Sequence, residues 1–481
     1  MIFNSFQYIL FLGGVVAFHW ALRRVWQQNL LLLVGGYLFY AAWDWRFLAL
    51  LGFTTLVNYT VSRLLARWPP GRWRTVALVA GLAANLGVLG FFKYFNFFAE
   101  SAVSLLTALG IQANPPGLQI ILPVGISFFT FQAMAYLIDA HSGQVTPTRS
   151  LLNFALYTAF FPQLTAGPIE RAVRLLPQVE RPRTLTPERV EEGLALILLG
   201  MFKKVVIADV AASLIEPGFF ATPADYPPAQ VMVGVYLFAL QIYGDFSGYS
   251  DIARGSASLL GFALVENFNQ PYFSQTVSEF WRRWHISLSL WLRDYLFFPI
   301  SRALLRWGWP SLPVYALATL ITMLLAGLWH GAAWTYVLWG GLLGLYLVGA
   351  RLLAGKALRW RKHRRVLVRL AVAGGSILLT FHLILIAWVV FRAPSLASAA
   401  GVYQQWWAAL GQGADLLALG WLPLALYAVS FIIDAGQVWA GDHAFTRRLS
   451  LPVGSLVYVA ALLLIIVFSV KPYVPFFYFQ F

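Results

Sequence analysis

The sequence predicts an all-α, polytopic membrane protein. Of its 481 residues, 60% are hydrophobic and only 11% are charged, a composition typical of chains that cross a bilayer repeatedly. Apolar runs bounded by charged or polar residues recur along the whole chain, and we expect them to form helices. The clearest of these runs cover residues 30–43, 76–92, 231–240, 332–350, 376–391 and 456–470.

The first apolar run is expected to stay in the mature protein as a helix, because no Lys or Arg precedes it as in a cleavable signal peptide. Basic residues follow this run at Arg23 and Arg24, and further clusters lie within residues 63–74 and 351–369. Loops rich in Lys and Arg face the cytoplasm. The amino terminus is therefore predicted to lie outside.

Several apolar runs are shorter than the roughly 20 residues that a helix needs to cross the hydrocarbon core. Such runs indicate re-entrant or broken helices, which are tolerated where they line a cavity. We find no internal repeat and no flexible linker. The sequence therefore predicts a single transmembrane domain over residues 1–481, with an undetermined number of crossings between residues 139 and 306.

The net charge of +15 does not indicate a nucleic-acid partner, because the Lys and Arg residues lie in short loops between apolar runs. This distribution is typical of orientation in the bilayer and of contact with membrane lipid. The chain has no cysteine, which excludes thiolate metal sites and an acyl-thioester on the protein. No metal-binding spacing, Walker-type loop or serine-hydrolase motif occurs, so we expect neither a metal nor a bound cofactor.

His330 is the first candidate for chemistry, since it lies between two apolar runs in the motif Trp329-His330-Gly331. An ionisable residue at membrane depth indicates a functional site. Burial disfavours the charged imidazole, so the ring stays available as a base near neutral pH. The small residues after it, 331–333, could leave room for a substrate. The alternative is a histidine that only joins packed helices by a hydrogen bond.

His285 is the second candidate, in a polar region that is predicted to form an amphipathic helix at the membrane surface. Thr276 precedes Glu279 by three residues, a capping-box spacing that starts this helix at about Val277. Three arginines of the region could meet an anionic donor, or could serve only as positive-inside anchors. They are Arg282, Arg283 and Arg293.

The third candidate is the run from Gln241 to Asp251, which continues an apolar segment and contains Tyr243 and Asp245. A carboxylate at the centre of a membrane helix costs roughly 2.5 to 3.5 kcal/mol, so Asp245 should face a cavity, water or a cation. Arg254 is the nearby candidate partner. A direct role in substrate binding and a structural ion pair both remain open.

Several motifs together resemble the membrane-bound O-acyltransferase (MBOAT) family, and within it the alginate O-acetyltransferase branch. The most specific are the Asp245 run, Glu266-Asn267-Phe268-Asn269, the segment 281–294 and Trp329-His330-Gly331. Weaker matches occur at residues 3–5, 89–94, 122–132, 161–169 and 391–393. The resemblance therefore spans nearly the whole chain.

The resemblance implies a ring of tilted transmembrane and re-entrant helices around a central tunnel, with His330 as the catalytic residue and His285 beside the same path. It implies a cytoplasmic donor such as acetyl-CoA, and an extracytoplasmic partner protein that passes the acetyl group to a polysaccharide. Trp329, Tyr243, Asp245, Asn269 and the three arginines are then candidates for substrate or donor binding. The expected location is the bacterial inner membrane.

Two other functions stay open. One is transfer of D-alanine from a carrier protein in a teichoic-acid pathway, which the same family includes. The other is a proton-coupled transporter whose intramembrane His and Asp residues relay protons, although transporters often carry the internal repeat that this chain lacks.

Overall fold

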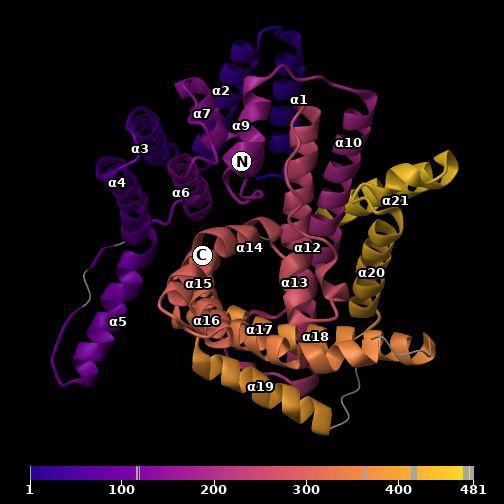
Figure 1. Ribbon diagram of the computed structural model, residues 1–481. Helices are drawn as coiled ribbons and strands as arrows, with labels where there is room; N and C mark the ends of the chain where they lie inside the picture. Colours follow the sequence, from indigo (N-terminus) through magenta and orange to yellow (C-terminus); the bar gives the residue numbers. More distant parts are fainter. Residues whose placement is uncertain are drawn as a thin grey trace. The chain divides into compact units, whose positions relative to one another are not determined.

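The computed structural model describes residues 2–114, 117–118, 120–361, 366–412, 420–469 and 476, with the backbone alone over 354–361. Within this described part every regular element is a helix (Figure 1). Part of the predicted basic cluster at 351–369 lies outside the described residues. Eight described helices or helix pairs are long and apolar enough to cross a membrane: Val25–Arg67, Arg72–Ala108, Pro228–Leu259, Ser311–His330, Trp334–Leu353, Val366–Arg392, Leu422–Ala440 and Leu451–Ser469.

The predicted all-α, polytopic membrane architecture is confirmed. The helices pack into two compact units. The first unit comprises residues 1–197 and 249–265, and the second comprises 198–248 and the described residues from 266 onward. A single domain over 1–481 and a ring of helices around a tunnel stay predictions.

The first unit contains the amino-terminal helices α1 to α9, most of α10 and the end of α12. Their bounds are α1 Phe6–Ala21, α2 Val25–Asp44, α3 Leu48–Arg67, α4 Arg72–Leu89, α5 Phe95–Ala108, α6 Ile126–Ser142, α7 Leu151–Ala159, α8 Phe161–Leu164, α9 Ala172–Glu180, α10 Pro187–Phe202 and α12 Pro228–Leu259.

Polar side chains join the apolar helices of the first unit. The side-chain amides of Asn58 and Asn85 donate to each other at 3.0 and 2.9 Å and so link α3 to α4. The Tyr8 hydroxyl hydrogen-bonds Ser256 Oγ at 2.8 Å. Hydrogen bonds of this kind between helices hold apolar segments in register where lipid gives no hydrophobic driving force.

The second unit contains the carboxy-terminal helices and the candidate site. Its elements after α10 are the π-helix η3 Lys203–Ala208, α11 Asp209–Ser213, the first part of α12, α13 Val277–Arg283, α14 Ile286–Leu292, the π-helix η7 Arg293–Phe297, α15 Phe298–Arg306, α16 Ser311–His330, α17 Trp334–Arg361, α18 Val366–Arg392, α19 Leu396–Gly411, α20 Leu422–Ala440 and α21 Leu451–Ser469.

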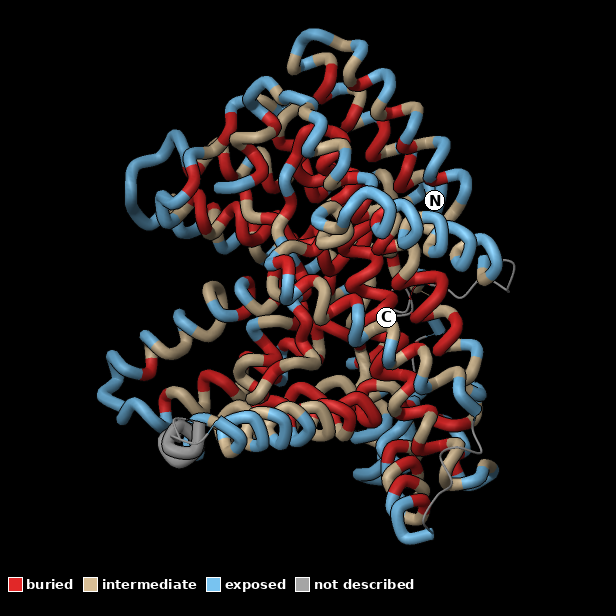
Figure 2. The backbone as a smooth tube through the Cα atoms, turned by 90° about the vertical axis from the view of Figure 1, so that its right-hand side faces the viewer, coloured by how far each residue is buried: buried red, intermediate tan, exposed pale blue. Residues whose placement is uncertain are grey.

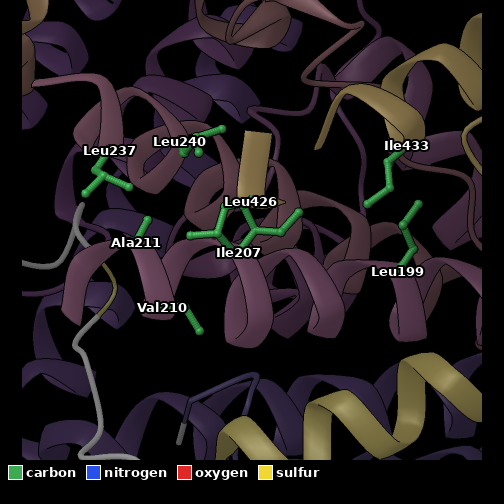
Figure 3. Close-up of a cluster of buried hydrophobic side chains, with 8 residues drawn as sticks. All are labelled: Leu199, Ile207, Val210, Ala211, Leu237, Leu240, Leu426 and Ile433. Carbon is green, nitrogen blue, oxygen red and sulfur yellow. The ribbon is translucent and has the colours of Figure 1, made fainter. Parts of the chain in front are cut away.

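One apolar cluster of the second unit joins α10, η3, α11, α12 and α20. In Figure 3 its aliphatic side chains converge from these helices, with Leu426 of α20 beside Ile207 of η3. Buried and exposed positions alternate along most helices, as Figure 2 shows, because one side of each helix packs on its neighbours. Helices α5, α15 and α21 are largely unburied, since each has a single buried residue among those described: Phe97, Leu304 and Gly454.

Candidate functional site

His330 is the last residue of α16, and a close helix pair fixes its position. The helix ends there because Gly331 is extended. Helix α17 then packs along α16 so closely that a Cβ at Gly340 would overlap the carbonyl oxygen of Met323. Glycine at this position therefore lets the two backbones approach, as small residues do between membrane helices.

The space beside His330 is not open on the side of the small residues. A Cβ at Gly331 would overlap the ring of Tyr336, so this side is filled by an aromatic side chain. The sequence-based expectation that residues 331–333 leave room for a substrate is therefore wrong at Gly331. Glycine serves here to let the Tyr336 ring approach.

Aromatic rings surround the His330 imidazole, which is 3% exposed. The ring centroids of Trp329, Trp339 and Phe391 lie 4.9, 5.0 and 5.6 Å from that of His330. The ring centroid of His285 lies 6.4 Å from that of His330, and the two ring planes are inclined to each other by 70°. A hydroxyl group or a water molecule between the two imidazoles could bridge them. The structure thus brings together two predicted histidines that are 45 residues apart in the sequence.

His285 is placed by a break in the backbone. The Thr276 hydroxyl accepts from the amide of Glu279, which confirms the predicted helix start at Val277. The continuous amphipathic helix predicted beyond it is wrong, however: α13 ends at Arg283, and His285 has φ 42° before α14 begins. A left-handed conformation is rare for a residue with a Cβ and is found at functional sites. The break aims His285 inward, and its side chain is fully buried.

Asn267 holds this break and sets the protonation of His285. Its Oδ1 lies 3.2 Å from the amide of Ser287, 2.9 Å from the Ser287 hydroxyl and 3.1 Å from Nδ1 of His285. A backbone amide can only donate, so the atom of Asn267 that faces it must be the oxygen. His285 Nδ1 therefore carries the hydrogen, and the lone pair lies on Nε2.

Burial also keeps His285 neutral. Removal from water disfavours the imidazolium ion and lowers the pKa of His285 to about 3. At neutral pH the ring therefore has one N–H group, bonded to Asn267, and one basic nitrogen. A neutral imidazole of this kind can accept a proton or a hydrogen bond from a hydroxyl group.

Asp245 lies in a buried charge cluster with Lys204 and Asp209. Lys204 Nζ lies 2.8 Å from Asp245 and 2.7 Å from Asp209. The two carboxylates raise the pKa of Lys204 against the effect of burial, so the amine stays protonated. The predicted partner Arg254 is wrong: Arg254 lies 3.7 Å from Asp251 instead.

The approach of Lys204 depends on a π-helical turn and on glycine. Lys204 belongs to η3, a π-helix, and π-turns are frequent at functional sites. A Cβ at Gly248 would come within 2.7 Å of the Gly200 carbonyl oxygen, so glycine allows α10 and η3 to lie against α12. On α12, Phe246 follows Asp245 and packs edge-on against the His285 ring at 4.7 Å. The charge cluster thus supports the helix that packs on His285.

The other predicted site residues divide into buried and exposed ones. The Tyr243 hydroxyl donates to Asp434 at 2.9 Å, and Tyr243 is buried. Asn269 is exposed, and its amide and carbonyl groups bond Arg283. These two residues lie in the same unit as the histidines.

The three predicted arginines differ in their partners. Arg283 pairs with Glu279 at 2.9 Å and Arg293 with Asp294 at 2.8 Å. Arg282 is exposed and makes no ion pair within the described part of the chain. Arg282 therefore has the guanidinium group that is most available to an anionic ligand.

A largely apolar pocket of about 210 Å³ lies in the same unit as the two histidines. Its lining comes from α13, α14, η7, α16 and α17: Trp281, Ser289, Leu292, Arg293, Phe297, Tyr315, Thr319, Thr322, Met323 and Leu347. In the described residues no group of three or more His, Cys, Asp or Glu side chains is arranged to hold a metal ion. The two imidazoles among aromatic rings can supply acid–base chemistry.

Sequence reasoning missed three residues of this arrangement: Lys204, Asn267 and Trp339. Lys204 could have been found as a charged residue inside the apolar stretch that runs from Leu196 to Ile207. Asn267 belongs to the motif Glu266-Asn267-Phe268-Asn269 that carries the resemblance, but its role could not be predicted, nor could that of Trp339, because both roles depend on contacts with residues distant in the sequence.

Comparison with known proteins identifies relatives of the whole chain. The model of the MBOAT, membrane-bound O-acyltransferase family matches residues 139–355, a stretch that contains both histidines. The probable alginate O-acetylase AlgI of Pseudomonas aeruginosa is 39% identical over 408 residues, which cover 84% of this chain and 74% of the relative. The protein of the same name from Pseudomonas putida is 37% identical over 487 residues, 94% of both chains. A peptidoglycan O-acetyltransferase of Helicobacter pylori is 34% identical over an alignment that covers 82% of this chain and 76% of the relative.

Proposed function

Because the chain belongs to the membrane-bound O-acyltransferase family, we propose that this O-acyltransferase passes an acetyl group from a cytoplasmic donor across the membrane for O-acetylation of a polysaccharide. The names of its relatives support this function, since they denote O-acetylation of alginate and of peptidoglycan. Both are carbohydrate polymers with hydroxyl acceptors. Alginate or a related extracytoplasmic polymer is the proposed final acceptor.

The observation that carries the proposal is the pair of buried imidazoles, His330 and His285, at a ring separation of 6.4 Å. His285 is neutral, with its lone pair on Nε2. Two imidazoles enclosed by aromatic rings can take up and pass on one proton where bulk water is excluded. Proton transfer of this kind is what acyl transfer to a hydroxyl group requires.

In the proposed reaction a ring nitrogen of His330 removes the proton of the acceptor hydroxyl while the oxygen attacks the thioester carbonyl carbon of the donor. The new C–O bond forms as the C–S bond breaks, and the thiolate leaves with the proton that His330 took up. His285 Nε2 orients the hydroxyl group or relays the proton. Holding both substrates in one enclosed site contributes through orientation.

The proposed donor is acetyl-CoA, whose phosphates suit the exposed guanidinium of Arg282. Arg283 and Arg293 add positive charge but already pair with carboxylates. The protein would act in the bacterial inner membrane, surrounded by lipid, and would deliver the acetyl group to an extracytoplasmic partner protein. The absence of cysteine leaves direct transfer or an oxygen or nitrogen nucleophile as the route.

The test is incubation of the purified protein with acetyl-CoA labelled in the acetyl group and with a saccharide as hydroxyl acceptor, followed by measurement of free CoA and of labelled saccharide. Release of CoA with label in an O-acetyl ester supports the proposal. A folded protein that releases no CoA, but transfers D-alanine from a charged carrier protein, would contradict it. Proton flux in liposomes without acyl transfer would favour the transporter instead.

A further inference from the structure

Two tryptophans separate the pocket described above from His330. Trp281 of α13 is part of the pocket lining, and its ring meets Trp339 of α17 edge-on at 6.0 Å. Trp339 also meets the His330 ring edge-on at 5.0 Å, whereas no ring contact joins Trp281 to His330 among the described residues. The order in space is therefore pocket, Trp281, Trp339 and His330.

This pair of rings, which we call the tryptophan wall, is held rigidly. Trp339 is 1% exposed and stacks on Trp388 of α18 at 5.9 Å with an interplanar angle of 16°. Phe391 packs against the same indole at 5.0 Å. At the next residue, Gly340, a Cβ would overlap the carbonyl oxygen of Met323, so α17 lies close against the backbone of α16 beside the indole. Rings in a close-packed interior of this kind do not yield to an added methylene group without strain.

We propose that the tryptophan wall limits the donor's acyl group to about the size of an acetyl group. The inference rests on the proposed function and places the alkyl end of an acyl group that reacts at His330 against Trp339, whose indole contacts the His330 ring. A short chain ends before the indole, whereas a longer one would have to enter the space that the two indoles occupy. The pocket of about 210 Å³ behind them could hold such a chain, but the wall closes it off.

Removal of an indole therefore opens the pocket to the acyl chain. A hydrophobic site discriminates by about 10- to 200-fold for each extra or missing methylene. We expect the wild type to use acetyl-CoA over butyryl-CoA by at least about 100-fold in kcat/KM. Trp339→Ala should lower this ratio at least about 10-fold, through a gain in activity with butyryl-CoA and hexanoyl-CoA.

The experiment measures CoA release by the full-length purified protein with acetyl-, butyryl- and hexanoyl-CoA, each in the presence of the same saccharide as hydroxyl acceptor. The variants are Trp339→Ala, the milder Trp339→Phe and Trp281→Phe, and each is checked for folding by thermal unfolding. The matched control is Trp406→Phe, because Trp406 of α19 is a buried tryptophan that packs on Tyr236. A gain with a longer acyl group cannot come from loss of structure.

A ratio shifted toward longer chains in the wall variants, but not in Trp406→Phe, supports the inference. Folded wall variants that keep the wild-type ratio of kcat/KM for acetyl-CoA and butyryl-CoA overturn the inference. If Trp339→Ala does not fold, Trp339→Phe and Trp281→Phe provide the test. A folded wild type that releases CoA from none of the donors refutes the proposed function and the inference with it. Wild-type turnover with unchanged selectivity in the variants refutes the inference alone.

Discussion

Replacement of Asn267 by Ala should lower kcat about 100-fold, because Asn267 holds His285 in a strained conformation. Its Oδ1 accepts three hydrogen bonds from the segment 285–287. At about 0.5–1.5 kcal/mol each, these bonds contribute about 1.5–4.5 kcal/mol. A left-handed residue with a Cβ costs about 1–2 kcal/mol. In Asn267→Ala these side-chain bonds no longer offset the strain, and we expect His285 to leave its position even though the bond from the Ile286 amide to the carbonyl oxygen of residue 267 remains.

The magnitude follows from what a positioned acid–base group supplies, about 10²–10⁴-fold in rate. Steady-state CoA release measures it, with KM expected to change less than kcat. Ser287→Ala is the matched control, since it removes one of the three bonds but leaves Nδ1 of His285 bonded. We expect Ser287→Ala to lower kcat less than about 10-fold.

Asn267→Asp tests the same reasoning by charge. The aspartate keeps an oxygen in place, and its negative charge should raise the pKa of His285 from about 3 by about 1–3 units. A protonated His285 cannot accept a hydrogen bond, so activity should fall with decreasing pH at about pH 4–6, where the wild type stays active. Wild-type kcat in Asn267→Ala, together with an unchanged pH profile in Asn267→Asp, would refute the reasoning.

Three further predictions concern stability, measured by denaturant titration in bicelles. Burial raises the pKa of Glu170 to about 7, so the folded protein favours the neutral carboxyl group and its stability should fall as pH rises from about 4.5 to 7. Glu170→Gln should remove this loss of about 3 kcal/mol. Equal stability of the wild type and Glu170→Gln at about pH 8 would contradict this prediction. Lys204→Met should lower the free energy of unfolding by about 3–5 kcal/mol because it leaves two buried carboxylates without their cation. A smaller loss of stability in the double variant Lys204→Met/Asp245→Asn would show that the effect is due to charge. Gly340→Ala should destabilise by about 1–3 kcal/mol through overlap with the α16 backbone, whereas Gly349→Ala in the same helix, with open space around it, should be neutral or stabilising.

The helical class and the start of α13 could be predicted because they depend on local signals. Apolar runs report membrane helices, and Thr276 with Glu279 forms a local cap. The end of α13 could not be predicted, because the sequence continues with a helix-compatible pattern. Asn267, 18 residues before His285, imposes the break through hydrogen bonds that leave no local trace.

The candidate site shows the same division. The chemistry of His330 and His285 was visible as residue type and depth. The resemblance to the family implied that they share one path, and the structure adds the ring separation of 6.4 Å. The partner of Asp245 was predicted as the nearest arginine along α12, but the tertiary fold brings Lys204 from η3 instead. A π-turn changes which residues of a helix face its neighbour, and sequence periodicity does not reveal it.

The most direct test of the central claim is the rate of CoA release from acetyl-CoA by His330→Ala, with His382→Ala as the matched control. His382 is also a histidine of an apolar helix, but Tyr236 and the Leu378 carbonyl oxygen bond its two ring nitrogens. We predict a loss of at least about 100-fold in kcat for His330→Ala and less than about 10-fold for His382→Ala. A folded His330→Ala protein with wild-type turnover would contradict the account.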